Sequence, residues 1–202
     1  MVLGLIERFE QRGSNTDLDE AVRLADCLSS QRANRQTWPH SAWGDNFHRA
    51  ARAFDVPPGK RSAITTCYVV RALIFPQHAL ATREFGQAVD QGMAFYRRAF
   101  FAENGDVKYY ANRTYPLDTH SVAQAVITLL RVGRADEDYA LAGRVIDRAI
   151  KHLYLPNEKR FVYRRGKYWS NRVNYMRWTQ AWAFYALSLY SAEGDRRARD
   201  AQ

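Results

Sequence analysis

The sequence predicts an all-α protein built from about three two-helix repeats, and two observations lead to this prediction. Helices of two kinds alternate: those expected over 17–30, 79–101 and 136–153 are amphipathic, and those over 62–75, 118–132 and 174–190 are apolar nearly all round. Short motifs also recur at a near-constant spacing of 64 and then 57 residues, beginning at Arg23, Gln87 and Arg144. Helix pairs at a fixed period stack into a two-layered solenoid or ring.

The amphipathic helices are expected to form the outer layer. Residues 136–153 show the clearest pattern, with an apolar stripe opposite a charged face that carries Arg144, Asp147, Arg148 and Lys151. The stripe consists of Tyr139, Ala142, Val145, Ile146, Ala149, Ile150 and Leu153.

The apolar helices are expected to form the inner layer. Asp118 follows Pro116 and is a good N-cap for the helix over 118–132. The connections from outer to inner helix, 102–117 and 155–173, are long and rich in Tyr, Asn and Arg, which is typical of functional loops. Short β-hairpin-like strands are expected there, for example over 159–163.

Composition excludes several classes of protein. The chain has 202 residues, of which 47% are apolar and 13% aromatic, and this excludes a disordered protein. No run of about 20 apolar residues occurs, so no membrane span is expected. The start of the chain lacks a signal-peptide core, and we therefore expect a cytoplasmic location.

Cys27 and Cys67 cannot form a disulfide framework, and the five histidines lack metal-ligand spacing. We expect no metal and no cofactor.

Positive charge is concentrated near the C-terminus. The net charge is +9, and residues 151–202 hold 11 Lys and Arg against 4 Asp and Glu. Between Lys159 and Arg177 there are seven basic residues and no acidic one, interleaved with five aromatic residues. This pattern suits a polyanion with flat faces, either an acidic polysaccharide or single-stranded nucleic acid. A solvated loop with ordinary surface charge is the third interpretation.

Two segments carry a resemblance to a known family. The first, Asp118-x-His120-x-x-Ala123-Gln124, opens one inner helix; the second, Tyr175-Met-Arg-Trp-x-Gln-Ala-Trp182, opens the next. Both resemble the six-hairpin α/α-toroid superfamily of glycosidases, sugar and uronate epimerases and polysaccharide lyases, and most closely bacterial polysaccharide-biosynthesis proteins. The resemblance covers roughly residues 15–192. It implies a partial α/α toroid and work on carbohydrates, without a defined reaction.

The chain is too short for a complete toroid. Six pairs at this spacing need roughly 340–380 residues, whereas this chain has 202. We therefore expect a single segment from the C-terminal part of a toroid, in which 1–12 end a preceding inner helix and 191–202 form a flexible tail. Its repeats are expected over 17–75, 79–132 and 136–190. Such an open arc is expected to associate with itself or with a missing N-terminal half.

Candidate site residues lie near the starts of the inner helices, where the resemblance implies a central cleft. Asp118 and His120 are the candidates for acid–base catalysis, although an N-cap role for Asp118 and a packed or hydrogen-bonded role for His120 are the favoured interpretations. Arg177, expected to be buried, either pairs with Asp118 or another carboxylate or binds a substrate carboxylate. The other expected sugar-binding residues are Tyr115, Gln124, Trp169, Tyr175, Trp178 and Trp43. Asp45 is a further candidate carboxylate.

Three functions remain open at this stage. The first is a carbohydrate-active or carbohydrate-binding protein in bacterial exopolysaccharide synthesis, with an oligosaccharide or polysaccharide, acidic or neutral, as its partner. The second is a non-catalytic helical-repeat interaction protein that uses its basic aromatic loop. The third is a nucleic-acid-binding protein.

Overall fold

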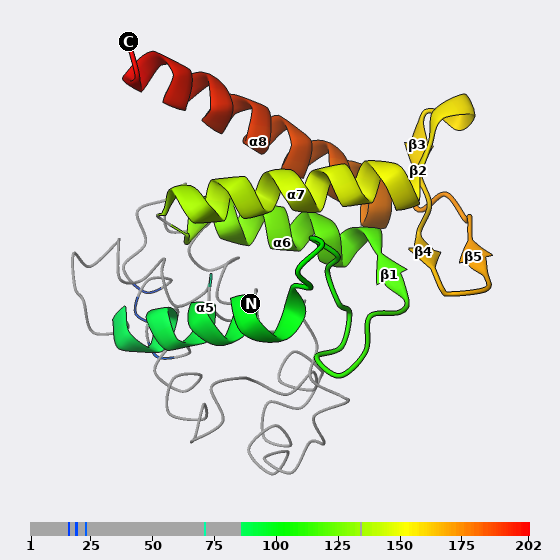
Figure 1. The fold of residues 1–202 in the computed structure, drawn as a ribbon, viewed down its shortest axis with the longest axis horizontal. Coiled ribbons are helices and arrows are strands. Elements are labelled where there is room, and N and C mark those ends of the chain that lie inside the picture. The colour runs from blue at the N-terminus through cyan, green and yellow to red at the C-terminus, as the bar shows by residue number, and fades with distance from the viewer. Residues whose placement is uncertain (1–15, 17–18, 20–22, 24–70, 72–85, 134) are drawn as a thin grey trace. The chain divides into compact units, whose positions relative to one another are not determined.

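The computed structural model describes residues 86–133 and 135–202 of the chain, together with four single positions (Figure 1). Those positions are Thr16, Asp19, Arg23 and Arg71, and all four are helical. The rest of the helices expected over 17–30 and 62–75 lies outside the described residues, as do Cys27, Trp43, Asp45 and Cys67.

The described part of the chain is mostly helical but contains two small antiparallel sheets, so the prediction of an all-α protein was wrong. The strands lie on the connections between helices: β2 pairs with β3 and β4 with β5 within one connection, whereas β1 pairs with β4 across two connections. The helices are α5 (Gly86–Phe100), α6 (Thr119–Arg131), α7 (Asp136–Leu153) and α8 (Ala181–Asp200). The strands are β1 (Leu117–Asp118), β2 (Tyr154–Leu155), β3 (Arg160–Phe161), β4 (Arg164–Arg165) and β5 (Ser170–Asn171). A 3₁₀ turn spans Pro156–Glu158 and a π-helical turn spans Met176–Gln180.

The backbone contacts divide the chain into two compact units, and the second includes Arg98–Gln202. Most of α5 belongs to the first unit. As its amphipathic pattern predicts, α5 buries Val89, Tyr96 and Phe100 on one face.

In the second unit, α6 is the central helix and packs against both α7 and α8 (Figure 1). Every residue of α6 from Thr119 to Leu129 is buried, which fits its apolar character on most sides. The α7 helix buries the predicted stripe at Ala142, Val145, Ile146, Ala149 and Leu153. Ile150, also predicted in this stripe, is instead 48% exposed.

The last helix differs from the sequence prediction at both ends. A π-helical turn replaces its expected first turn, and α8 then continues to Asp200, so residues 191–200 are helical where a tail was expected. The reason is packing against α7: the rings of Tyr139 and Tyr190 stack with centroids 4.6 Å apart and planes 7° apart. Arg197 adds an ion pair to Asp136 and lies over the ring of Tyr139. Only Ala183 and Ala186 of α8 are buried.

The three-stranded sheet has the order β1-β4-β5 and pairs the residues just before α6 with the connection between α7 and α8. In its antiparallel register, Asp118 lies opposite Arg164 and Arg164 lies opposite Asn171. The start of α6, which follows β1, is therefore attached to the connection of the next repeat.

The helices α5 and α7 are each followed by a short antiparallel turn that contains a residue with positive φ. After α5, Phe101 pairs with Val107, and the turn contains Gly105 at φ +89°. After α7, β2 pairs with β3, and the turn contains Lys159 at φ +50°. Lys159 directly precedes β3, and Gly105 lies two residues before Val107.

These two turns give a matched prediction. Gly105→Ala should lower the free energy of unfolding by about 1–2 kcal/mol, because an L-residue is strained at this φ. A Cβ there would also lie 2.9 Å from the carbonyl oxygen of Arg144. Lys159→Gly, the control, should leave stability within about 1 kcal/mol, since glycine adopts this φ without strain. Urea unfolding followed by circular dichroism measures both. Equal losses in the two variants would contradict the backbone strain expected at Gly105.

Candidate functional site

Asp118 is the residue around which this end of the second unit is organised. It ends β1 and caps α6, with one carboxylate oxygen accepting hydrogen bonds from the Ser121 backbone N–H at 2.8 Å and the Ser121 hydroxyl at 3.1 Å. The other oxygen accepts a hydrogen bond from Nε of Arg164 at 2.5 Å. The Asp118 side chain is fully buried, and both of its oxygens are engaged.

Arg164 is held from three sides. Its guanidinium carbon lies 4.6 Å from the ring centroids of both Tyr109 and Tyr163, in addition to its ion pair with Asp118. Burial opposes the charge of this guanidinium, but the hydrogen bond and the charge of Asp118 outweigh that effect, and the pKa of Arg164 is raised. Burial likewise raises the pKa of both tyrosines. Arg164 therefore stays charged and is held in place.

The arginine that pairs with Asp118 is thus Arg164 and not Arg177, which corrects one of the two roles expected for Arg177. The antiparallel register of β1 and β4 places Arg164 directly across from Asp118. Arg177 is exposed in the π-helical turn and makes no ion pair with any carboxylate of the described residues.

Further hydrogen bonds hold the start of α6 and the start of α8 to the same connection. Thr119 donates from its backbone to the Tyr163 carbonyl at 3.2 Å and from its hydroxyl to the Val162 carbonyl at 2.5 Å. The amide of Gln180 accepts from the Phe161 N–H at 3.0 Å and donates to the Phe161 carbonyl at 2.7 Å. Both helix starts are therefore fixed to residues 161–164.

His120 is fully buried and lies against two tryptophans at the start of α8. Its ring stacks on that of Trp178, with centroids 4.2 Å apart and planes 7° apart, and meets the ring of Trp182 edge-on at 5.5 Å. Nδ1 of His120 lies 3.2 Å from the backbone carbonyl oxygen of Trp178. Burial lowers the pKa of His120, while the charge of Asp118 acts in the opposite direction.

Trp178 has one face covered by His120 and remains 49% exposed. Tyr175 and Met176, just before it, are also exposed. The rings of Tyr175 and Tyr163 meet edge-on with centroids 4.9 Å apart. Because Tyr163 also lies against Arg164, this contact connects the exposed segment to the Asp118–Arg164 ion pair. Trp178 therefore presents a flat aromatic surface. One face of its indole packs on His120, and much of the ring is accessible to solvent.

The structure brings some of the predicted site residues together and separates others. His120 contacts Trp178 directly, and Asp118 connects to Tyr175 through Arg164 and Tyr163. Gln124 is fully buried inside α6. Tyr115, 42% exposed, precedes β1 and makes no ring contact with Trp178. Trp169 lies on the β4–β5 hairpin.

The expected catalytic pair, Asp118 and His120, is enclosed by protein in this structure. Asp118 holds the start of α6, and His120 supports Trp178. The arrangement is thus suited to presenting an aromatic surface, and acid–base chemistry by these residues stays a prediction.

Sequence reasoning missed Arg164, Tyr109, Tyr163 and Gln180 as organising residues. The alternation of basic and aromatic residues over 159–177 includes two of them, but only the strand register shows which arginine faces Asp118.

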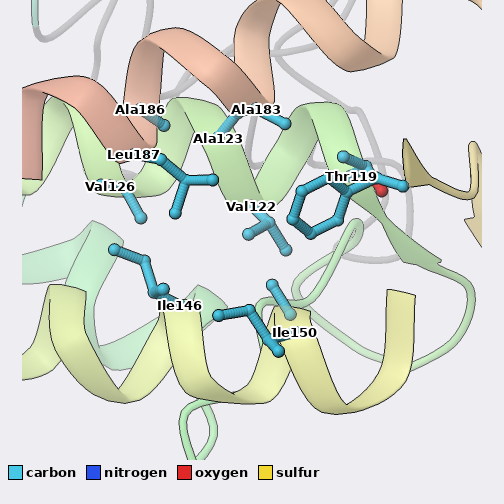
Figure 2. Close-up of a pocket in the computed structure, with 11 residues that line it drawn as sticks. Thr119, Val122, Ala123, Val126, Ile146, Ile150, Ala183, Ala186 and Leu187 are labelled. Atoms are coloured by element: carbon cyan, nitrogen blue, oxygen red, sulfur yellow. The ribbon is translucent and has the colours of Figure 1, made fainter. Parts of the chain in front are cut away.

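A separate apolar groove lies between α6, α7 and α8 (Figure 2). It is open to solvent, shallow and lined mainly by aliphatic side chains such as Val122, Ile146 and Leu187. The hydroxyl of Thr119 at its edge already donates to Val162. The groove therefore offers little to a polar ligand.

The described residues contain no group of three or more side chains suited to hold a metal ion. None of the helices in this part of the chain is long and apolar enough to cross a membrane. Comparisons with protein-family models, curated proteins and solved structures find no match for this chain.

Removing the charge of Asp118 should test its structural role. Asp118→Asn keeps the shape but loses the ion pair with the partly buried Arg164, and should lower the free energy of unfolding by about 2–3 kcal/mol. Asp147→Asn, on the charged face of α7, is the control and should change it by less than about 0.5 kcal/mol. Chemical denaturation measures both. A loss below about 0.5 kcal/mol for Asp118→Asn would show that the pair does not hold this end of the unit.

The depressed pKa of His120 predicts a pH dependence of stability. The unfolded chain takes up a proton on this side chain near its ordinary pKa of about 6.5, and the folded chain does so only at lower pH. The free energy of unfolding should therefore fall as the pH drops below about 6.5.

His120→Phe, which keeps a flat ring, should reduce this fall between about pH 7 and pH 5. His152→Phe is the control: burial also lowers the pKa of His152, but this side chain is less enclosed, so the change should be smaller. Denaturation midpoints of the wild-type chain and both variants, measured between about pH 7 and pH 5, test this prediction. An unchanged slope in His120→Phe would contradict the prediction.

Proposed function

We propose that this chain is a carbohydrate-binding protein that acts in bacterial exopolysaccharide synthesis, with Trp178 as its sugar-binding surface. The observation that carries the proposal is the half-exposed indole of Trp178, which is stacked on the buried ring of His120. An aromatic ring whose orientation is already fixed loses little conformational entropy when a ligand binds.

The chemistry of sugars fits such a surface. A pyranose ring has an apolar face of C–H groups that packs on an indole, while its hydroxyls need polar partners at the rim. Tyr175, with its hydroxyl, and Arg177, with its guanidinium, both precede Trp178 in the sequence, are exposed, and provide such partners.

The two segments that resemble the six-hairpin superfamily meet at this point. His120 belongs to the first and Trp178 to the second, and the two rings are in contact. Within the second segment, Gln180 fixes the backbone of Phe161, and Trp182 contacts His120, so both support the exposed ring. This division between supporting and exposed residues favours binding over catalysis.

Removing the indole tests the proposal. Trp178→Ala should weaken binding to a soluble polysaccharide by at least about tenfold, because the stacking surface is lost. Phe184→Ala is the matched control, since Phe184 is a highly exposed aromatic residue of α8 outside this cluster. Affinity electrophoresis and titration calorimetry against acidic and neutral polysaccharides measure the effect.

Equal weakening in both variants would contradict the assignment to Trp178. If the folded wild-type chain binds no polysaccharide of the panel, the carbohydrate proposal fails. The non-catalytic interaction protein would then be favoured, because Phe184 and Tyr185 offer an exposed aromatic surface on α8 for a protein partner.

A further inference from the structure

The hairpin formed by β4 and β5 carries a second tryptophan, Trp169, whose ring, like that of Trp178, is supported on one face and partly exposed. The indole of Trp169 lies on Gly166, and a Cβ at that glycine would collide with the indole nitrogen. The Gly166 N–H donates to the Trp169 carbonyl at 2.8 Å, which closes the turn. Gly166 is buried beneath the ring, whereas Trp169 is 55% exposed. One face of the indole is again supported, and much of the ring stays open.

Only some of the basic side chains around this hairpin form an ion pair with a carboxylate of the described residues. Of the seven between Lys159 and Arg177, Arg164 pairs with Asp118, and two others share Glu158. The remaining four have no carboxylate partner among the described residues: Lys159, Arg165, Lys167 and Arg177. Lys167 extends over the ring of Tyr168, which is itself almost fully exposed. The hairpin therefore presents uncompensated positive charge next to aromatic rings.

We propose that the β4–β5 hairpin is a second subsite, and that its ligand is a carboxylate-bearing polysaccharide. This rests on the proposed function of Trp178. A sugar ring stacks on Trp169, and its carboxylate pairs with Lys167 or Arg165 of the same hairpin. Arg177 takes the corresponding place beside Trp178.

Spacing in the chain favours this ligand over single-stranded nucleic acid. In a uronic acid the carboxylate is attached directly to the ring that stacks, so the cation must lie next to the aromatic residue. Lys167 and Trp169 are two residues apart in one turn, and Arg177 and Trp178 are adjacent. In a nucleotide the phosphate is separated from the base by a ribose, and successive bases stack along a continuous groove.

The ligand is a polymer because the two tryptophans lie on different elements. Trp169 belongs to the hairpin and Trp178 to the π-helical turn, and the contact between Tyr163 and Tyr175 connects these elements. A chain that occupies both subsites gains affinity from each, because the second contact is made by a ligand already bound.

The test compares two polymers that differ only in charge: polygalacturonate and its methyl ester. The wild-type chain should bind polygalacturonate at least about tenfold more tightly at low salt, and added salt should reduce this preference. Lys167→Gln should reduce the preference at least about threefold. Arg199→Gln, at the exposed end of α8, removes the same charge elsewhere and should leave it unchanged.

Gly166→Ala tests the support of Trp169. The added methyl group should displace the indole and weaken binding of both polymers, as Trp169→Ala also should. Circular dichroism confirms that each variant folds, and Lys167→Gln, an exposed change, tests the subsite if Gly166→Ala does not fold.

The outcomes separate the two proposals. Equal binding of both polymers, still lost in Trp178→Ala, would overturn the anionic subsite and leave sugar binding at Trp178 intact. If Trp169→Ala binds both polymers as tightly as the wild-type chain does, the hairpin subsite is overturned. Tighter binding of oligothymidylate than of polygalacturonate would overturn the ligand class in favour of nucleic acid.

Discussion

The ion pair between Asp118 and Arg164 is the interaction on which the rest of this unit depends. Burial of a carboxylate is unfavourable unless it is hydrogen-bonded and paired, and Asp118 has these partners in Ser121 and Arg164. The same pair joins the cap of α6 to the strand β4 of the next repeat. Because Tyr109 and Tyr163 enclose the guanidinium, three separate segments are held by one charge pair.

Fixed aromatic surfaces follow from this arrangement. The start of α6 is held by Thr119 and Asp118, and this positions His120 beneath Trp178. On the hairpin, Gly166 supports Trp169 by having no side chain. Both tryptophans are therefore oriented before any ligand arrives, and a rigid surface of this kind binds with a smaller entropic cost. Asp118 and His120 are themselves buried, and in the proposed function they position the exposed rings.

Much of the helical structure could be predicted because it depends on local periodicity. The stripe of α7 and the all-round apolar character of α6 both appear in the structure as burial patterns. The sheets could not be placed in the same way, since two-residue strands such as β1 and β4 carry no periodic signal and form only by pairing. The C-terminal extension of α8 was missed because it depends on the stack of Tyr190 on Tyr139.

The sequence by itself determined the positions of α6 and α7, the N-cap of α6 at Asp118, and where positive charge and aromatic residues gather. Only the tertiary structure decided that Arg164, rather than Arg177, neutralises Asp118 and that Arg177 remains exposed. The physical reason is that composition and spacing report local preferences. The choice between two nearby arginines instead depends on strand register, which is set by contacts between residues 46 positions apart.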